Sequence, residues 1–335
     1  MCIMWRMNEL ETMSVEGQPV AEREGAKPGR PARAIAVSNQ KGGVGKSVTT
    51  VNMAEALARQ NQRVLVVDVD GQGNTASALG IEEDMVDKDN QLSDVLLGRK
   101  VDLAKMVLKS NRKDLKIDVV APTQNLQVID LEILQAGIIE GLNKGREPGN
   151  PADGLQEFVA TKAANMYLNL RHGLVEPFRP FYDYILIDCP PGYSMVTGSA
   201  VLACDGVLVP LDSSGWAWEG AKRAVLYFDA VSALTGERIR TLGFLLTRFR
   251  PQLTAHQTIK AQLEQAYPDE SFKATIRECV YFMESAYEGV SLWEAKGRRR
   301  TIVADYEILT NEIVQRFTQA EALKIAETAP DESHL

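Results

Sequence analysis

The chain has 335 residues, of which 45% are hydrophobic, so it can bury a full core as one large domain without requiring a second. Its formal net charge of −8 excludes a uniformly basic surface, so contact with nucleic acid would need a local basic patch. The sequence has four cysteines, Cys2, Cys189, Cys204 and Cys279. They show no C-x-x-C spacing, so neither a zinc site nor an iron–sulfur cluster is suggested, and a reducing cytoplasm is the expected compartment.

The first 33 residues are predicted to form a flexible tail. They hold no apolar run of signal-peptide length, and their second half has a composition typical of disorder. The folded domain is expected over residues 34–326, followed by an acidic tail at residues 327–335. Residues 1–33 are too few for a helix-turn-helix domain, so binding of this segment to a specific DNA operator sequence is not expected.

A glycine-rich loop between a strand and a helix is the strongest local pattern. Ala34–Ser38 is a short apolar run of strand type, and Lys46–Gln60 carries apolar residues at a helical period. Residues 41–47 read Lys-Gly-Gly-Val-Gly-Lys-Ser, which departs from the common G-x-x-x-x-G-K-[ST] loop because Gln40 stands where its first glycine belongs. A second apolar strand, Arg63–Asp68, follows the helix. This order predicts a phosphate-binding loop in a parallel α/β sheet.

Each position of this loop has a chemical role in binding a nucleoside triphosphate. Glycines let successive backbone N–H groups point at phosphate oxygens, and the following helix adds its positive end. Lys46 would reach the β- and γ-phosphates, and the Ser47 hydroxyl would ligate Mg²⁺. Lys41 is a second cation at the mouth of the loop, which indicates charge stabilisation of a phosphate, including one on a neighbouring subunit. The predicted phosphate-binding residues are Lys41, Gly42, Gly43, Val44, Gly45, Lys46, Ser47 and Val48.

Two strands end in carboxylates that would lie beside this loop. Asp68 and Asp70 occupy alternate positions at the end of one strand, hence one face. Tyr184–Asp188 is an apolar strand that ends in a single acid, the form of a Walker B site. In a parallel sheet the ligand lies beyond the carboxyl ends of the strands. We expect Asp188, and as a further candidate Asp68, to hold the Mg²⁺ shell through water, and Asp70 to orient or activate the attacking water. Lys41, Lys46 and Asp70 are the expected catalytic residues.

Further apolar strands indicate the fold class. They recur at Asp118–Pro122, Gly206–Pro210 and Thr241–Thr247, separated by helical stretches. The alternation predicts an α/β fold with a doubly wound, mainly parallel sheet flanked by helices in one domain. An insertion at about residues 135–165 has a centre rich in turn formers, and it is either a surface excursion or a docking element.

Basic residues gather in the carboxyl-terminal third of the chain. The run Lys296, Arg298, Arg299 and Arg300 is either a solvated face or a DNA contact. Five further basic residues would extend it if the fold brings them together: Arg248, Arg250, Lys260, Lys273 and Arg277. The last helix carries an apolar stripe, which is expected to pack on the sheet: Tyr306, Leu309, Ile313, Phe317, Ala320 and Leu323.

Three stretches resemble the ParA branch of the ParA/MinD ATPases, whose phosphate loop is the deviant Walker A form: Ser38–Ser47, Asp68–Asn74 and Asp188–Pro191. Val209–Gly220 and Glu284–Gly289 are supporting matches to later segments of that family. The resemblance implies a P-loop NTPase fold with ATP and Mg²⁺ as cofactors. It also implies an ATP-dependent homodimer, in which Lys41 reaches the nucleotide of the other subunit.

The same resemblance implies a cellular role. ParA-type dimers bind DNA without sequence preference, and a ParB-like partner stimulates their weak hydrolysis of ATP to ADP and phosphate. The expected function is segregation of plasmid or chromosome DNA on the nucleoid. The alternative is a ParA-like positioning ATPase whose cargo is a chemoreceptor cluster, a microcompartment or a secretion apparatus. The acidic tail argues against a MinD-type membrane anchor, and no membrane partner is expected.

Three residues depart from the family pattern. Val48 stands where a second hydroxyl usually touches the α-phosphate, so nucleotide binding is expected either to be weaker or to rely on backbone N–H groups alone there. Gly71 replaces a proline between the strand acids and the following helix, and Gly192 stands where a serine is common. None of these changes removes an expected catalytic group.

Overall fold

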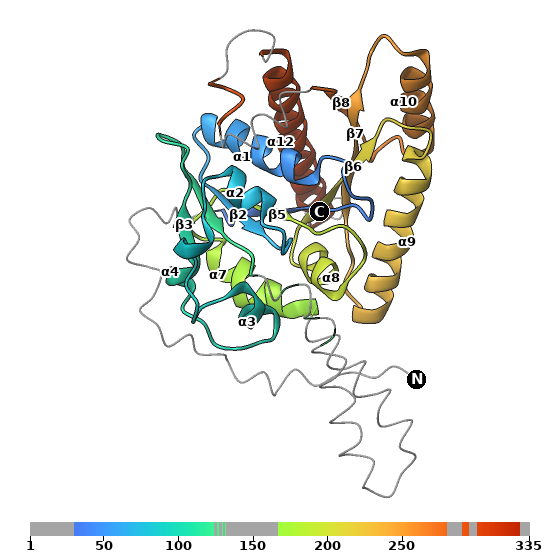
Figure 1. Cartoon of the computed structure of the whole chain (residues 1–335). Coiled ribbons are helices and arrows are strands. Elements are labelled where there is room, and N and C mark those ends of the chain that lie inside the picture. The colour runs from blue at the N-terminus through green and yellow to red at the C-terminus, as the bar shows by residue number, and fades with distance from the viewer. Residues whose placement is uncertain are drawn as a thin grey trace, which may run out of the picture.

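An eight-stranded sheet with helices on both faces forms the centre of the molecule (Figure 1). The computed structural model describes residues 30–123, 126, 129, 131, 167–279, 290–294 and 300–328. The strands are β1 (Arg33–Val37), β2 (Val64–Asp68), β3 (Val107–Lys109), β4 (Ile117–Val120), β5 (Tyr184–Asp188), β6 (Gly206–Asp212), β7 (Thr241–Phe249) and β8 (Ser271–Arg277). Their order across the sheet is β3-β4-β2-β5-β1-β6-β7-β8, and β3 alone runs antiparallel to its neighbour. The prediction of a mainly parallel, doubly wound sheet is confirmed.

The three central strands are buried along their whole length. Every residue of β1, β2 and β5 is buried, because helices cover both faces of the sheet. These strands consequently read as continuous apolar runs in the sequence, and all three were predicted to within about one residue. Parallel pairing places Asp188, the last residue of β5, opposite Val37 of β1 and Asp68 of β2.

Two groups of helices enclose the core. One face is covered by α1 (Lys46–Arg59), α2 (Asn74–Ala78) and α12 (Arg300–Thr328). The other face is covered by α3 (Leu92–Leu96), α4 (Leu103–Met106), α7 (Glu176–Phe178), α8 (Met195–Leu202), α9 (Ala217–Thr235) and α10 (Thr254–Ala266). A 3₁₀ turn, η2 (Glu83–Met85), and a π-helical turn, η4 (Arg171–Val175), complete the described elements. None of the helices within the described residues is long and apolar enough to cross a membrane.

The two edge strands were not predicted from the sequence. β8 has alternating burial and carries Lys273 and Arg277, so it lacks the continuous apolar run of a central strand. β3 has three residues and no fully buried position. Both lie at an edge of the sheet, where one side of the strand has no hydrogen-bonded neighbour.

The predicted packing of the last helix is confirmed for the part of α12 whose side chains are described. Its apolar stripe is buried on the face of the sheet that α1 also covers, through Tyr306, Leu309, Ile313 and Phe317. The centre of the predicted insertion, the first 29 residues and the last seven residues lie outside the described part of the chain.

A buried ion pair joins α1 to three other segments. The Arg112 guanidinium lies 2.6 Å from a carboxylate oxygen of Glu55 in α1, with the two side chains 5% and 1% exposed. Arg112 also donates to the carbonyl of Ala78 at the end of α2, at 2.8 Å, and the Ser291 hydroxyl donates to the second oxygen of Glu55. The pair therefore ties α1 to the end of α2 and to the segment that carries Ser291.

We expect Arg112→Ala to lower the free energy of unfolding by about 3 to 5 kcal/mol, because it leaves the Glu55 carboxylate buried without its partner. Arg99→Ala is the control, since Arg99 pairs with Asp94 at the surface and its removal should change stability by less than about 1 kcal/mol. Urea unfolding followed by tryptophan fluorescence measures both. Equal losses in the two variants would contradict a special role for the buried pair.

Candidate functional site

The predicted phosphate loop lies between β1 and α1, at the carboxyl end of the sheet (Figure 1). Gly43 and Gly45 have φ angles of 72° and 88°, in the left-handed region that favours glycine. Gly45 is the N-cap of α1, and its carbonyl accepts the N–H of Thr49. The glycines therefore allow the chain to curl directly into the helix, with the helix N-terminus at the loop.

Lys46 is folded back over the loop. Its side chain is buried, and its ammonium donates to the carbonyl of Lys41 at 3.2 Å. Burial lowers the pKa of Lys46, whereas the nearby carboxylate of Asp188 favours its charged form. An anion held by the loop would pair with this ammonium and stabilise it further.

Lys41 lies at the surface, beside the end of β6. Its side chain is 55% exposed, and its ammonium lies 3.6 Å from a carboxylate oxygen of Asp212 at the end of β6. The Lys41 N–H donates to the side-chain oxygen of Asn39 at 2.9 Å, and the Asn39 amide donates to the carbonyl of Pro210 at 2.6 Å. β6 therefore holds both the backbone and the side chain of Lys41. Sequence reasoning missed Asp212 because β6 is remote in the chain, and it missed Asn39 because the residue that its amide contacts, Pro210, lies on that remote strand.

Asp188 is fully buried beneath the start of α1. Its two carboxylate oxygens accept hydroxyl groups from two helices, that of Thr75 at 2.7 Å and that of Thr50 at 3.4 Å. Burial raises the pKa of Asp188 to about 6, although hydrogen bonds from Thr75 and Ser47 and the charge of Lys46 oppose the shift. Neither threonine was predicted as a site residue.

Asp68 is buried beside Asp188 and organises the next loop. One carboxylate oxygen accepts the N–H of Asp70 at 3.0 Å, and the other accepts the N–H of Ala76 at 2.9 Å. Burial and the neighbouring charge of Asp188 raise the pKa of Asp68 well above its usual value. The contacts of Asp68 are thus to the backbone of the β2–α2 loop, and a water-mediated contact to a metal stays a prediction.

Asp70 forms a turn at the start of the same loop. Its carboxylate accepts the N–H of Gln72 at 3.1 Å, and its carbonyl accepts the N–H of Gly73 at 2.9 Å. Gly73, with a φ of 65°, is the N-cap of α2. The turn forms although Gly71 replaces the family's proline.

The residues around Lys46 suit a magnesium–nucleotide complex. The Ser47 hydroxyl is close enough to Asp188 to lower its pKa, so a hydroxyl and a carboxylate meet at the start of α1. Hydroxyl and carboxylate oxygens are ligands that Mg²⁺ prefers, and Lys46 with the helix N-terminus provides positive charge for phosphate. Val48 is partly buried and offers no hydroxyl, as expected from the sequence.

The candidate DNA-binding residues are only partly placed. Arg277 makes a two-pronged pair with Asp305 of α12, at 2.9 Å for one oxygen, and donates to the carbonyl of Thr301 at 2.6 Å. Lys296, Arg298 and Arg299 lie outside the described residues, as does the side chain of Arg300. Arg277 therefore has a structural partner that the sequence did not indicate.

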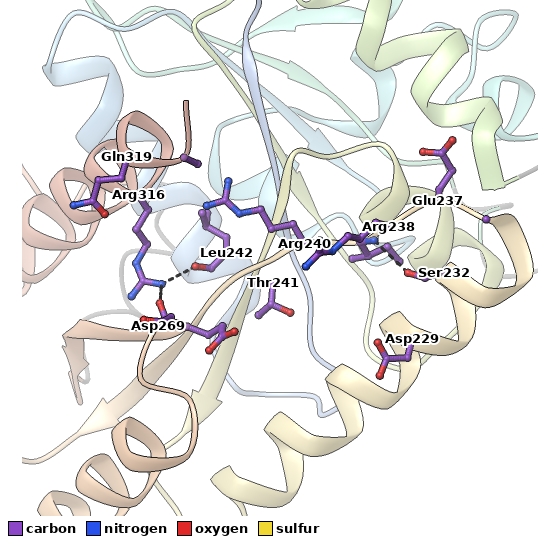
Figure 2. Close-up of a pocket in the computed structure, with 14 residues that line it drawn as sticks. Asp229, Ser232, Glu237, Arg238, Arg240, Thr241, Leu242, Asp269, Arg316 and Gln319 are labelled. Carbon is purple, nitrogen blue, oxygen red and sulfur yellow. Dashed lines mark hydrogen bonds between the residues drawn. The ribbon is translucent and has the colours of Figure 1, made fainter. Parts of the chain in front are cut away.

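Figure 2 shows a cavity of about 720 Å³ at the amino end of β7, the end away from the phosphate loop. Arg316 points into it, but its guanidinium already donates to the carbonyls of Leu242 and Asp269, at 2.8 and 2.9 Å. The lining mixes basic with acidic side chains and contains no predicted site residue. The cavity is thus separate from the candidate site.

Comparison with known proteins places this site in context. A family model described as an AAA domain matches residues 32–141 and 154–240. The chromosome partitioning protein ParA of Myxococcus xanthus is 30% identical over 291 residues, which cover 85% of this chain and 89% of that protein.

Solved structures share the fold. An ATP complex of a McdA variant from Cyanothece has a TM-score of 0.66 at 17% identity, covering 86% of this chain and 98% of that one. The septum site-determining protein MinD of Pyrococcus horikoshii, complexed with Mg-ADP, has a TM-score of 0.56 at 19% identity, covering 84% and 96%. Both confirm the predicted P-loop NTPase architecture.

The raised pKa of Asp188 predicts a pH-dependent effect of Asp188→Asn in the nucleotide-free protein. The unfolded carboxyl ionises near pH 3.8 and the folded one near 6, so the stability contributed by the protonated group is complete below 3.8 and lost as pH rises through about 6. Raising pH from about 5 to 7.5 should therefore shift the difference between the proteins by about 1 kcal/mol in favour of the variant.

Urea unfolding at the two pH values, without nucleotide or metal, measures this difference. Leu226→Ala, at an exposed position of α9 and with no titrating group, is the control whose difference from wild type should stay constant with pH. A constant difference for Asp188→Asn as well would contradict the assignment.

Proposed function

Since the chain belongs to the ParA/MinD family of P-loop ATPases, we propose that it acts as a nucleotide-switched homodimer that segregates plasmid or chromosome DNA. The switch binds ATP with Mg²⁺, and its dimer binds DNA without sequence preference. A ParB-like activator stimulates a weak intrinsic hydrolysis of ATP to ADP and phosphate and so releases the dimer. The work takes place in the cytoplasm on the nucleoid.

The observation that carries this proposal is that the two lysines of the loop differ in burial and in the groups they contact. Lys46 is buried and its ammonium donates to a carbonyl of its own loop, whereas Lys41 is 55% exposed and its ammonium lies beside Asp212 of β6. An exposed pair such as Lys41 with Asp212 contributes about 1 kcal/mol or less, so a phosphate from a second subunit can displace the carboxylate. This arrangement supports Lys41 as a cation for the nucleotide of the facing subunit.

Each residue of the site has a separate role in ATP hydrolysis. Lys46 binds the β- and γ-phosphates, while Ser47 and Asp188 hold Mg²⁺, which neutralises charge on the phosphates. Asp70 orients the attacking water, and its place on the β2–α2 loop, next to Asp68 and α2, supports that role. Lys41 adds positive charge from the other subunit, so that hydrolysis depends on the dimer.

A second function is supported by the pairing of two basic residues with carboxylates. The guanidinium of Arg277 is engaged by Asp305, and that of Arg250 by Glu278. The net charge of −8 also limits the basic surface. These observations favour the alternative of a positioning ATPase whose cargo is a protein assembly, and the two functions share one chemical cycle.

Lys41→Ala should lower ATP turnover at least about tenfold and abolish the ATP-dependent dimer, because one across-dimer charge contact is removed from the transition state. ADP binding should be unchanged. Asp70→Ala should retain ATP and accumulate as a dimer, because its hydrolysis stops. Phosphate release and sedimentation velocity with ATP or ADP measure these effects.

Lys46→Ala serves as the control that binds neither nucleotide. Undiminished turnover in Lys41→Ala would contradict the across-dimer role. A monomeric Asp70→Ala protein in ATP would contradict the expectation that the dimer persists until ATP is hydrolysed.

Duplex DNA of arbitrary sequence should bind only with ATP, and its affinity should fall steeply between about 50 and 200 mM salt, because binding releases counterions. Replacing Lys296, Arg298 and Arg299 together by alanine should weaken binding and reduce the salt slope. Fluorescence anisotropy with ATP, ADP or no nucleotide measures both. Absence of DNA binding under every nucleotide condition would instead favour a protein cargo.

A further inference from the structure

We propose that Arg248, at the end of β7, is a third cation of the phosphate site and binds a phosphate oxygen of the nucleotide at the mouth of the loop. The inference rests on the proposed function, since it takes the loop to hold a nucleotide. It adds a residue 207 positions after Lys41, on an element that no phosphate-loop pattern includes.

The end of β7 is fastened to the loop by the residue before Arg248. Thr247 is buried, and its hydroxyl donates to the carbonyl of Val44 at 2.9 Å. The carbonyl of Thr247 accepts the Ser213 hydroxyl at 2.7 Å, which ties the same strand end to β6. These bonds hold the backbone of Arg248 at a set position beside the loop.

The backbone of Arg248 is in a strained conformation. Its φ angle is 51°, in the left-handed region, which disfavours side chains other than those of glycine, asparagine and aspartate. Strain of this kind persists where surrounding contacts impose it and is frequent at functional sites. The bonds of Thr247 are such contacts here.

The side chain of Arg248 lies against the loop. A terminal guanidinium nitrogen is 3.9 Å from the point that a β-carbon on Gly43 would occupy. Gly43 thus has room for the guanidinium beside it, and the positive charge of Arg248 is placed next to the glycines whose N–H groups are expected to bind phosphate.

Arg248 also differs from its charged neighbours in having no carboxylate beside it. Within the described part of the chain, Lys41 pairs with Asp212, Arg250 with Glu278 and Arg277 with Asp305, whereas Arg248 is exposed and unpaired. A guanidinium presents a planar set of donors that suits phosphate oxygens, so its natural counter-ion here is the nucleotide.

The phosphate can belong to the nucleotide of the same subunit or to that of the facing subunit in the dimer. Both sources offer the same chemistry, and they differ in one respect. Binding within one subunit is independent of protein concentration, whereas binding across the dimer requires association.

The test measures the affinity of the full chain for ATP and for inorganic tripolyphosphate, which has no base or ribose. Arg248→Ala should weaken both ligands about tenfold, the typical effect of one lost hydrogen bond to a charged group. Arg248→Lys should restore part of the affinity. Arg250→Ala, two residues away but paired with Glu278, is the matched control and should bind as wild type does.

Arg248→Gly separates a binding role from a structural one. It should weaken tripolyphosphate as strongly as Arg248→Ala and yet raise the melting temperature, because glycine accepts the φ of 51° without strain. A loss of affinity with a higher melting temperature supports binding.

Unchanged affinity for tripolyphosphate in Arg248→Ala and Arg248→Gly overturns the proposal. This holds even if the affinity for ATP falls, because the lost contact would then be to the base or ribose. If wild type binds neither ligand, the proposed function fails as well; if wild type and the Arg248 variants bind equally, this inference fails alone. A loss seen at all protein concentrations assigns the contact to the same subunit, and a loss confined to dimer-forming concentrations assigns it to the facing subunit.

Discussion

The parallel pairing of β5 with β1 and β2 is the constraint on which the candidate site depends. It aligns the carboxyl ends of three buried strands, so that Asp188 lies beside Asp68 and opposite the residue that leads into the phosphate loop. Burial raises the pKa of both carboxyls, and the charge of Asp188 raises that of Asp68 further, so their charged forms are unfavourable by themselves. Hydroxyl and backbone N–H donors to both carboxylates, and the ammonium of Lys46 near Asp188, oppose these shifts.

The same donors belong to the elements that would respond to a nucleotide. Asp188 accepts the hydroxyl of Thr75 in α2, and Asp68 accepts N–H groups from both ends of the β2–α2 loop. A metal or phosphate bound near Asp188 therefore acts on a carboxylate that already holds α2. On the far side of α1, Arg112 joins Glu55 to the carbonyl at the end of α2. The short helix α2, which follows the loop that carries Asp70, is thus held near its start and at its end by charged groups.

Positive charge reaches the phosphate loop from separate elements. Lys46 comes from α1 and is buried. Lys41 comes from the loop itself and pairs with Asp212 of β6, and Arg248 comes from the end of β7. The order β1-β6-β7 across the sheet brings these elements together at its carboxyl end. Their partners differ: Lys46 faces its own loop, Lys41 has a weak carboxylate partner, and Arg248 has a glycine beside it. Such a set combines one buried cation with two exposed cations that an incoming phosphate would pair with.

The sequence by itself determined the parts of this protein that are encoded in contiguous residues. The phosphate loop, the acids Asp68, Asp70 and Asp188, and the central strands were readable because glycine spacing and unbroken apolar runs are local patterns. Only the tertiary structure decided which distant side chains meet them, namely Thr75, Asp212 and Arg248, and that Arg277 is paired with Asp305. It also decided the edge strands β3 and β8, whose residues lack a continuous apolar run. The physical reason is that strand order and register, which follow from the packing of the whole sheet, place these residues, and no stretch of neighbouring residues records that order.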